Sequence, residues 1–491
     1  GFGGNWGFGE SNLNYREREY DIAVAYHADM NFTMIRNWVG QIGDKEFYEA
    51  CDRHGIMVWQ DFWLANPVDG PNPYYTEMFN ANACDYLKRI RNHPSIGIYV
   101  GRNEGNPPAG IDDYLRGLVF REHPGLYYIS NSAMGVVSGG GPYRALSPKS
   151  YFQSYGHDKF HSERGMPNVM NYESMLLTFG TDKIEPVNTS ETPNPVYGLH
   201  DYTLGGGKGS SAQAASSFND MIEKAFGRPR DAKQFAEWAQ WINYDGYRAI
   251  FEGRSEHRRG MLLWMSHSAW PSMVWQTYDY YFDPNAAYFG CKKASEPLHI
   301  QWNPLRDDIE VVNYHAFDRT GLTATASLFN QDGTLQWTRE TKLDIKEDQT
   351  VACFPLEQPE TLSDTYFIKL SLTDSDGKQL SDNFYWRGKE DGNYKSLLQL
   401  PKVSVCKNVT VKKTGKEWLI RAVLKNEART PALMLRLKVA GEKSGRMLLP
   451  VFYSDNYFSL LPGEVKEVDI RLYDADTYGE KPVLEVLGFN L

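Results

Sequence analysis

The feature that constrains the fold most is an abrupt change of pattern near residue 297. Before it, short segments that are apolar on both faces alternate with amphipathic helical segments, which is typical of a parallel sheet covered by helices. After it, strands of alternating apolar and polar residues follow one another with turn sequences between them, which is typical of β-sandwiches. The sequence therefore predicts an α/β part followed by an all-β part.

The first part contains about eight candidate strands, the number that closes a (β/α)8 TIM barrel. In chain order they are the opening GGNWGF, Phe32–Trp38, Ile56–Trp63, Ile96–Glu104, Leu126–Ser132, Gly141–Leu146, Tyr155–Glu163 and Gly260–Trp270. Helical segments are expected at Asp44–Gly55, from about Tyr75 to Asn92, and at Ile111–His123. We therefore predict a barrel over residues 1–296.

The second part is expected to hold two sandwiches. Alternating strands such as IEVVNYHAF and LTATASLFN are separated by turn sequences such as NQDGT and DSDGK. The polar, glycine-containing segment Lys389–Leu397 marks the boundary between the two. We predict immunoglobulin-like β-sandwiches over residues 297–391 and 392–491. A long insertion rich in Thr, Ser, Gly and Pro, residues 181–230, lies near the end of the barrel.

Composition narrows the class of partner. The net charge of −10 disfavours nucleic acid, which requires a basic face, and no run of about 18 apolar residues predicts a membrane span. The five cysteines are scattered without C-x-x-C spacing, which argues against a disulfide scaffold and a zinc ribbon. Aromatic residues make up 14% of the chain. Aromatic rings stack on sugar faces but also fill large β cores, so both interpretations stay open.

Two glutamates end predicted barrel strands, where the chemistry of a parallel barrel is found. Glu104 ends Ile96–Glu104, and Glu163 ends Tyr155–Glu163. A buried, unpaired charge is costly, so each glutamate is either a solvated loop residue or held for a purpose. Two carboxylates at one barrel mouth are what glycoside hydrolysis requires, because one protonates the leaving oxygen and the other attacks or activates water.

Histidines give a weaker signal. His157, His161 and His267 stand near predicted strand ends but lack H-E-x-x-H spacing, so we expect neither a catalytic metal nor a cofactor. His161 is kept as a candidate for hydrogen bonding to sugar hydroxyls.

The residues around the two glutamates resemble glycoside hydrolase family 2. NHPSIGIYVGRNEG resembles that family's signature for the fourth barrel strand, and FHSERGMP resembles the signature of the seventh. The resemblance implies that Glu104 is the general acid/base, that Glu163 is the nucleophile, and that Asn103 binds the sugar 2-hydroxyl. MIRNWVG resembles the second strand, whose arginine, here Arg36, supports the nucleophile, and GPY resembles the sixth, whose tyrosine, here Tyr143, hydrogen-bonds it.

The resemblance extends over essentially the whole chain. EACDRHGIMVWQDFW and LLWMSHSAWPSMVW are similar to the branch of β-mannosidases, plant-type endo-β-mannosidases and exo-β-glucosaminidases. Members of that branch carry a jelly-roll domain and a further sandwich ahead of the barrel. The opening GFGGNWGF reads as a strand entered midway, so we expect this chain to be the C-terminal part of a longer protein. One departure is Val39-Gly40-Gln41, where the family has Gly-Gly-Gly after Arg-x-Trp.

The resemblance also suggests the sugar and the residues around it. The glucosaminidase branch has a carboxylate two residues after the arginine of the second strand, where this chain has Trp38, and that pattern favours a β-mannoside. Asp61 is the first alternative carboxylate for an amino sugar. Trp264 is the predicted stacking platform, and the further candidates for the pocket lining are Trp38, Trp63, Trp270 and Trp275.

We therefore predict a retaining β-glycoside hydrolase that cleaves β-mannosidic linkages in a glycoside or oligosaccharide, with carboxyl groups about 5–5.5 Å apart. We expect a raised pKa for the Glu104 carboxyl, which must keep its proton. The alternatives are an exo-β-D-glucosaminidase or another β-glycosidase of the family, an inactive carbohydrate-binding relative, and a structural or adhesive multi-sandwich protein. The sequence leaves open whether cleavage is at the chain end or internal.

Overall fold

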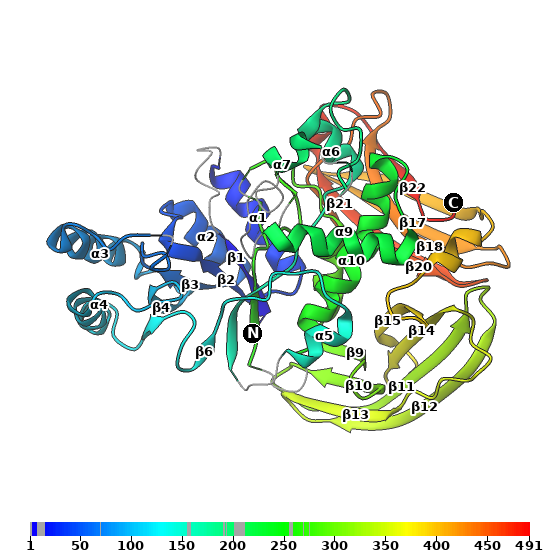
Figure 1. Ribbon diagram of the computed structural model, residues 1–491, viewed down its shortest axis with the longest axis horizontal. Coiled ribbons are helices and arrows are strands. Elements are labelled where there is room, and N and C mark those ends of the chain that lie inside the picture. Colours follow the sequence, from blue (N-terminus) through cyan, green and yellow to red (C-terminus); the bar gives the residue numbers. More distant parts are fainter. Residues whose placement is uncertain are drawn as a thin grey trace. The chain divides into compact units, whose positions relative to one another are not determined.

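The structure is a computed structural model, shown in Figure 1. It describes residues 2–6, 15–68, 70–154, 159–189, 192, 194–200, 212–254, 259–268, 270–273 and 275–491, without the side chains of 212–217. His157 lies outside the described residues. The chain forms two compact units. The first comprises Gly1–Tyr143, Tyr155–Met166 and His257–Tyr280, and the second comprises Arg144–Ser154, Pro167–Glu256 and Tyr281–Leu491.

The first unit contains one parallel sheet of eight strands, and this confirms the predicted TIM barrel. The strands are β1 (Phe2–Trp6), β2 (Met34–Asn37), β3 (Met57–Asp61), β4 (Ile96–Arg102), β5 (Tyr127–Asn131), β6 (Val137–Ser138), β7 (Phe160–Arg164) and β8 (Met261–Leu263). Their hydrogen-bonded order is β5-β4-β3-β2-β1-β8-β7-β6, so the first strand pairs with both the second and the eighth.

The interior of this sheet is apolar at its amino end and polar at its carboxyl end. Trp59, Val100, Val137 and Leu262 form its buried core. Side chains two residues apart share one face of a strand, so Asp61, two residues after Trp59, faces the same interior at the carboxyl end. Residues of the second and seventh strands add further polar groups there, and this edge is where a parallel barrel carries its site.

Helices cover the outside of the sheet in the first unit (Figure 1). They are α1 (Glu17–Asp29), α2 (Lys45–His54), α3 (Thr76–Ile90) and α4 (Ala109–Glu122), with the short 3₁₀ helix η2 (Trp38–Gly40). In α2 the apolar Phe47, Tyr48 and Cys51 are buried, as their spacing predicted, and Gly55 ends the helix with a left-handed φ of 70°. The predicted helical segments are therefore confirmed to within a few residues.

The prediction for the sixth strand was wrong. Gly141–Leu146 is a loop, and the sixth strand is the two-residue segment Val137–Ser138 that precedes it. Gly140 and Gly141 have φ values of +79° and +84°, which an extended strand cannot accommodate, and Pro142 has no N–H to donate to a ladder. Tyr143 therefore reaches its position from a loop and not from a strand.

The second unit combines helices with two sandwiches. Its helices are α5 (Pro148–Gln153), α6 (Tyr172–Phe179), α7 (Pro195–His200), α9 (Ala212–Phe226), α10 (Ala232–Glu252) and α11 (Ala286–Ala294). The longest, α10, is buried along most of its length and packs closely on α11, since a Cβ at Gly290 would lie 2.5 Å from the Tyr244 carbonyl oxygen. In the described part of the chain, no helix has the length and apolarity needed to cross a bilayer.

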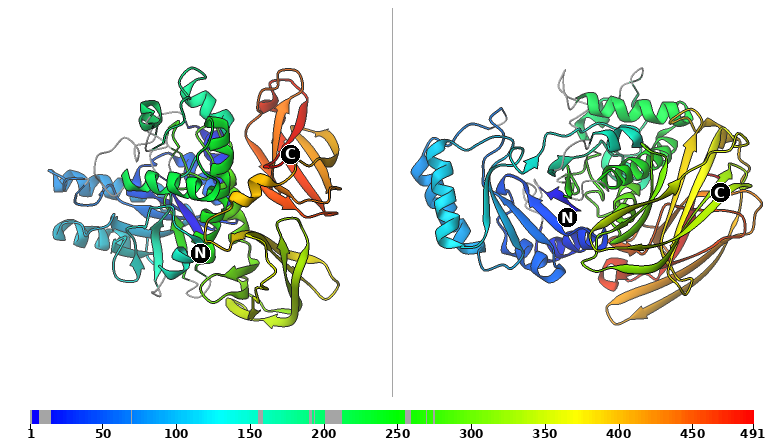
Figure 2. Two further views of the ribbon diagram at one scale, coloured as in Figure 1. Left: turned by 45° about the vertical axis from the view of Figure 1, so that its right-hand side comes forward. Right: turned by 90° about the horizontal axis from the view of Figure 1, so that it is seen from below.

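The all-β part confirms the two predicted immunoglobulin-like sandwiches, which Figure 2 shows as separate stacks coloured yellow-green and orange-red. The first pairs a sheet β13-β10-β9 with a sheet β12-β11-β14-β15, and the second pairs β16-β17-β21-β19 with β20-β18-β22. Their strands are β9 (Leu298–Asn303), β10 (Asp308–Asn313), β11 (Arg319–Asn330), β12 (Leu335–Ile345), β13 (Gln349–Pro355), β14 (Thr365–Thr373), β15 (Gln379–Gly388), β16 (Val405–Thr414), β17 (Glu417–Asn426), β18 (Ala432–Gly441), β19 (Val451–Tyr453), β20 (Phe458–Leu460), β21 (Val465–Tyr473) and β22 (Pro482–Leu487). The exact domain boundaries stay a prediction.

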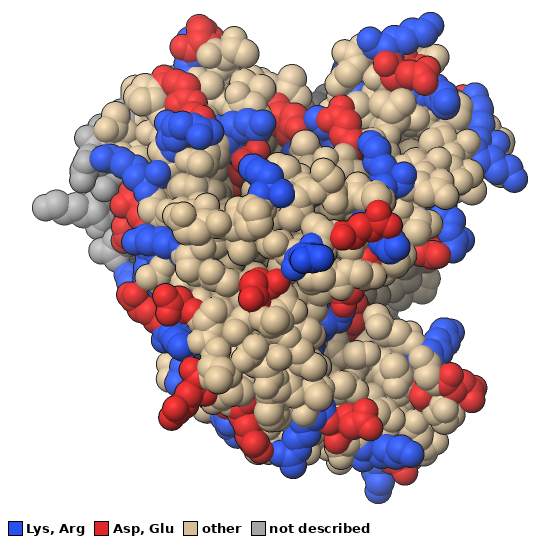
Figure 3. Space-filling model, turned by 90° about the vertical axis from the view of Figure 1, so that its right-hand side faces the viewer, with Lys and Arg blue, Asp and Glu red and all other residues tan. Residues whose placement is uncertain are grey.

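Acidic and basic side chains are intermixed on the face shown in Figure 3. The second sandwich carries exposed ion pairs, such as Lys413–Asp474 at 2.7 Å and Lys425–Glu427 at 2.9 Å. Such pairs contribute little to stability because water and salt screen them.

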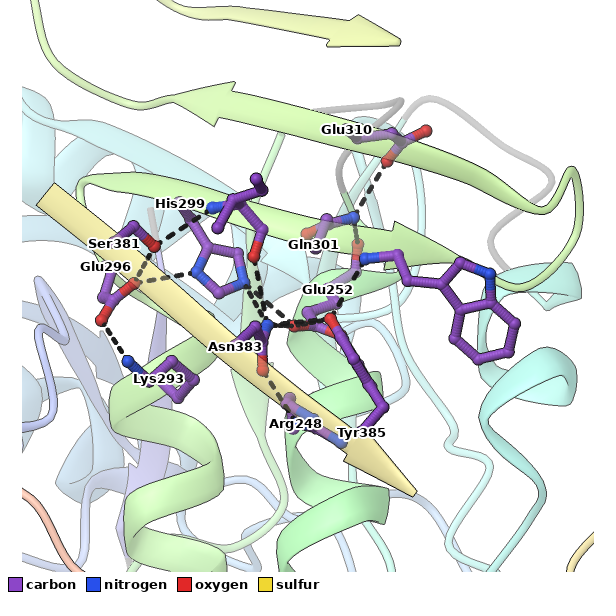
Figure 4. Close-up of polar contacts among 12 residues, drawn as sticks. Arg248, Glu252, Lys293, Glu296, His299, Gln301, Glu310, Ser381, Asn383 and Tyr385 are labelled. Atoms are coloured by element: carbon purple, nitrogen blue, oxygen red, sulfur yellow. Dashed lines mark hydrogen bonds and ion pairs between the residues drawn. The ribbon is translucent and has the colours of Figure 1, made fainter. Parts of the chain in front are cut away.

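A buried polar network joins α10 and α11 to the first sandwich (Figure 4). His299 lies between two carboxylates, with its Nε2 2.9 Å from Glu252 and its Nδ1 3.0 Å from Glu296. Asn383 and Tyr385 of β15 also donate to Glu252, at 2.8 and 2.9 Å. Because ionised carboxylates only accept hydrogen bonds, both ring nitrogens must carry protons, which makes His299 a buried cation.

We expect His299→Gln to destabilise the protein by about 3–5 kcal/mol, since it leaves the Glu252 carboxylate, 2% exposed, buried without its cation, whereas Glu296 keeps Lys293. Burial lowers the pKa of His299, but the hydrogen bonds that it donates to Glu252 and Glu296 outweigh burial and raise that pKa above its usual value. The stabilisation is therefore fully present below about pH 6.5, the pKa of an unfolded histidine, and is lost as the pH rises through the raised pKa.

Urea unfolding midpoints at pH 6 and pH 9 measure this effect. The difference between the wild type and His299→Gln should be larger at pH 6. His315→Gln is the matched control, because burial lowers the pKa of His315 in the same sandwich. An equal difference at both values of pH would contradict a charged His299.

Candidate active site

Four strands bring polar side chains to one edge of the parallel sheet. Arg36 lies on β2, Asp61 ends β3, Asn103 follows β4, and Glu163 lies on β7. All four side chains are buried: Arg36 and Asp61 are 0% exposed, Asn103 is 2% and Glu163 is 3%. Burying this much charge requires that the groups satisfy one another, and Arg36 shows how they do.

The guanidinium of Arg36 is the centre of the cluster. Its Nη1 donates to Glu163 Oε1 at 2.6 Å and to Asn5 Oδ1 at 3.3 Å. Its Nη2 donates to Asp61 Oδ2 at 2.7 Å and to Asn103 Oδ1 at 2.8 Å, and its Nε donates to the same Asp61 oxygen at 3.0 Å. Burial lowers the pKa of Arg36, but the charges of Asp61 and Glu163 outweigh it and raise that pKa, so the cation is permanent.

Glu163 is held by a donor on each oxygen. While Arg36 binds Oε1, the hydroxyl of Tyr143 donates to Oε2 at 2.6 Å. Hydrogen bonds of this kind favour the ionised carboxylate. Burial, followed by the charges of Glu163 and Glu104, raises the pKa of Tyr143 well above its usual value, so the phenol keeps the proton that it donates.

Glu104 lies close to the loop that carries Tyr143. A Cβ at Gly140 would be 3.7 Å from Glu104 Oε1, and the next residue, Gly141, donates its N–H to the Glu163 carbonyl at 3.2 Å. The charges of both glutamates act on the Tyr143 hydroxyl. The two carboxylates therefore share one mouth of the barrel, and the predicted separation of about 5–5.5 Å stays a prediction.

The backbone at Asn103 and Glu104 is fixed in an uncommon conformation. Glu104 has a φ of +47°, a left-handed value that costs free energy in a residue other than glycine. Its N–H donates to Ser132 Oγ at 2.9 Å, and the N–H of Asn103 donates to the Leu64 carbonyl at 2.9 Å. Because Arg36 only donates, the Asn103 atom facing it is Oδ1, and the amide nitrogen points away from Arg36.

Asp61 is surrounded by hydrogen-bond donors of the protein. Besides Arg36, its Oδ2 accepts the N–H of Val39 at 3.0 Å, and its Oδ1 accepts the indole N–H of Trp59 at 2.7 Å. With 0% exposure it presents no surface to a ligand. These contacts place Asp61 in a supporting position beside Arg36, and its role as the first alternative partner for an ammonium group stays a prediction.

An aromatic wall surrounds the Tyr143 side of the site. Trp264, Met265 and Trp275 form a buried cluster against which Trp38 and Tyr143 pack. The ring centroids of Trp38 and Trp264 lie 5.0 Å apart, and those of Tyr143 and Trp275 lie 5.7 Å apart. Trp264, the predicted stacking platform, therefore lies next to Tyr143, whose hydroxyl donates to the predicted nucleophile Glu163. Trp63 and Trp270 are 37% and 39% exposed and lie outside this cluster.

His161 has both ring nitrogens engaged within the fold. Its Nδ1 lies 2.7 Å from Ser138 Oγ, and its Nε2 lies 2.8 Å from the Gly141 carbonyl oxygen. These contacts brace the loop that leads to Tyr143, so the geometry favours a supporting position over direct binding to sugar hydroxyls. His267 is buried against Tyr278, and burial together with the charge of His27 holds its pKa well below the usual range.

Three supporting residues were missed from the sequence. Asn5 donates to the carbonyls of Ser162 and Leu263 while accepting from Arg36, so it joins β1 to β7 and β8. Ser132 follows β5 and bonds the Glu104 backbone, and Trp59 bonds Asp61. Asn5 and Ser132 share one signal, which is a polar side chain near the carboxyl end of a barrel strand.

Comparisons with known proteins agree with this fold. The chain is 26% identical to mannosylglycoprotein endo-beta-mannosidase of Lilium longiflorum, with 99% of this chain and 62% of that protein covered. It is 27% identical to exo-beta-D-glucosaminidase of Streptomyces avermitilis, with 99% and 58% covered. The chain thus spans about three fifths of the length of these relatives.

Solved structures show the same fold. The exo-chitosanase CsxA of Amycolatopsis orientalis has a TM-score of 0.87 at 24% identity, and covers 100% of this chain and 62% of its own. The beta-D-mannosidase of Dictyoglomus thermophilum has a TM-score of 0.78 at 20% identity, with 100% and 60% covered. Residues 383–491 match the family model described as the exo-beta-D-glucosaminidase Ig-fold domain.

Proposed function

Because the chain's resemblance to the β-mannosidase and exo-β-glucosaminidase branch of glycoside hydrolase family 2 is confirmed, we propose that it is a retaining β-glycoside hydrolase. The single observation that carries the proposal is the pair of 2.6 Å contacts that Arg36 and Tyr143 make to the two oxygens of Glu163. They hold both oxygens of Glu163 and aim the carboxylate at one point, which a nucleophile requires.

The reaction proceeds by two displacements. Glu163 attacks the anomeric carbon while the bond to the leaving oxygen breaks, and Glu104 gives its proton to that oxygen. In the second step Glu104 takes a proton from water, whose oxygen replaces Glu163 at the same carbon. Arg36 is shared with Asp61, so its charge does not fully neutralise Glu163, and this preserves the nucleophilicity of that carboxylate.

The sugar that we propose is β-mannose. An amino sugar would need a carboxylate for its ammonium group, and the position two residues after Arg36 is occupied by Trp38. An indole attracts a cation by only about 0.5–2 kcal/mol, less than a buried carboxylate supplies. Asp61 is fully buried and already binds Arg36, so it offers no alternative.

A β-glucosaminide is the second candidate. The relative from Streptomyces avermitilis and the family model over residues 383–491 both carry the name of exo-beta-D-glucosaminidase. This candidate requires a carboxylate outside the cluster around Arg36.

A screen of aryl β-glycosides tests both candidates and the inactive alternatives. We expect turnover of the β-mannoside, and a kcat/KM at least about tenfold lower on the β-glucosaminide, which corresponds to about 1.4 kcal/mol in transition-state binding. The reverse order would establish the second candidate. No turnover of any β-glycoside would favour a carbohydrate-binding or structural protein.

A further inference from the structure

The loop between β3 and α3 carries three exposed aromatic side chains at the edge of the sheet where the site lies. It comprises the described residues 62–68 and 70–75 and is called the β3–α3 loop below. Tyr74 is 92% exposed, Tyr75 is 71% and Trp63 is 37%. A segment next to a site that carries exposed aromatic side chains offers groups on which a ligand can bind.

Arg102 fixes this loop to the strand that carries the predicted acid. Its guanidinium donates to the Ala65 carbonyl at 2.7 Å, to the Gly70 carbonyl at 3.1 Å and to Asn72 Oδ1 at 2.7 Å. Arg102 is 3% exposed, and the three acceptors in these contacts are neutral. The buried guanidinium therefore serves to hold the backbone of the loop in place. Burial lowers the pKa of Arg102, as expected for a cation without a compensating charge in these contacts.

Two further contacts hold the β3–α3 loop beside Glu104. The N–H of Asn103 donates to the Leu64 carbonyl at 2.9 Å. On the other side of Glu104, a Cβ at Gly105 would lie 2.8 Å from the ring of Pro67, so only glycine allows this approach. The loop therefore lies against the residues on both sides of Glu104, whereas the wall of Trp264, Trp275 and Tyr143 lies beside Glu163.

In the proposed reaction, the side of Glu104 and the side of Glu163 face different parts of the substrate. Glu104 protonates the glycosidic oxygen, so the group that departs leaves on the side of Glu104. Sugar rings have apolar C–H faces, and tyrosine offers both a ring for stacking and a hydroxyl for hydrogen bonding. The ring of Trp63 is held against Phe79 and Tyr86, at 5.9 and 5.1 Å between centroids, and forms a fixed base for the loop.

We propose that the β3–α3 loop forms a binding subsite for a sugar on the leaving-group side, with Tyr74 and Tyr75 as its stacking residues and Arg102 as its positioning residue. The proposal rests on the proposed function and narrows it. The preferred substrate is a neutral β-linked oligosaccharide, because a glycoside with a small leaving group cannot reach the loop.

The test compares two substrates that differ only in the leaving group. β-Mannosyl fluoride releases a single atom and makes no contact with the loop, whereas β-1,4-mannotriose places sugars on it. In the double variant Tyr74→Ala/Tyr75→Ala, kcat/KM on mannotriose should fall at least about tenfold, and kcat/KM on the fluoride should change by less than about twofold. Arg102→Lys should raise KM for mannotriose more than KM for the fluoride, since an ammonium group cannot bridge three acceptors.

The matched control is Tyr127→Ala. Tyr127 is 78% exposed and begins β5, so it lies at the opposite edge of the sheet, and neither substrate should be affected. Equal losses on both substrates in the double variant, or no loss on mannotriose, would overturn the subsite and leave the proposed function standing. A wild type that turns over neither substrate would overturn the proposed function together with the subsite.

Discussion

Replacement of Glu163 by glutamine is expected to reduce kcat/KM on every β-glycoside by about 10⁴-fold or more, because a neutral amide cannot form the glycosyl ester. The substitution changes shape very little, and Arg36 and Tyr143 keep one acceptor oxygen between them. Arg36 also keeps Asp61 as an ion partner, so the variant should remain folded and the loss should appear in turnover of aryl β-mannoside. Turnover near the wild-type value would exclude Glu163 as the nucleophile.

The matched control for this variant is Glu173→Gln. Glu173 also binds an arginine, since its Oε2 lies 2.8 Å from Arg436, but both residues belong to the second unit. The charge of Arg436 overcomes burial and lowers the pKa of Glu173 to about 2, so it too is a firmly ionised carboxylate. Its replacement should leave turnover unchanged, which separates loss of the nucleophile from loss of a buried ion pair in general.

The strand-end residues of the site could be predicted because they depend on a pattern with a short period. Arg36 stands near the end of the predicted strand Phe32–Trp38 and Glu163 ends the predicted strand Tyr155–Glu163, and in a parallel sheet such ends converge without any knowledge of packing. The roles within the cluster were then supplied by the resemblance to family 2. The same reasoning located the change to sandwich strands, since β9 begins at Leu298 and the pattern changes near residue 297.

Residues that depend on tertiary geometry could not be predicted in this way. Tyr143 was assigned to a strand, although two glycines with positive φ turn the chain into a loop before it. Asp61 looked like an accessible strand-end carboxylate, and only its four hydrogen bonds, from Arg36, Val39 and Trp59, reveal that it faces protein on all sides. The helix α10 went unnoticed because it is buried nearly all round and so lacks a polar face.

The subsite on the β3–α3 loop bears on the choice between cleavage at a chain end and internal cleavage. Arg102 ends β4 and Glu104 follows two residues later, so Arg102 holds the loop against the backbone that leads to the acid. In the proposed subsite, the departing sugar stacks on Tyr74 and Tyr75. A protein that gains binding energy on the leaving-group side selects oligosaccharides by the sugars that depart. It also selects them by the sugar held beside Trp264.

Replacement of Glu104 by alanine should produce a loss that depends on the leaving group. A substrate with a poor leaving group, such as an alkyl β-mannoside or mannotriose, needs a proton at the departing oxygen, so its kcat/KM should fall by about 10²–10⁴-fold. An activated aryl glycoside such as a dinitrophenyl β-mannoside departs without protonation, and its first step should proceed nearly as in the wild type. Its second step should be slow, because no base activates water, and the glycosyl-enzyme should accumulate as a burst of released phenol.

The configuration of the product formed with azide distinguishes the acid/base role of Glu104 from the nucleophilic role of Glu163. In Glu104→Ala the covalent bond to Glu163 forms first, and azide attacks that intermediate from the side that Glu104 vacated, so two inversions yield a β-mannosyl azide. In a variant that removes the side chain of Glu163, azide attacks the substrate directly, and one inversion yields the α-azide. An α-azide from Glu104→Ala would show that the acid and the nucleophile have been assigned the wrong way round. Equal losses on the alkyl and dinitrophenyl substrates would show that the proton comes from another residue.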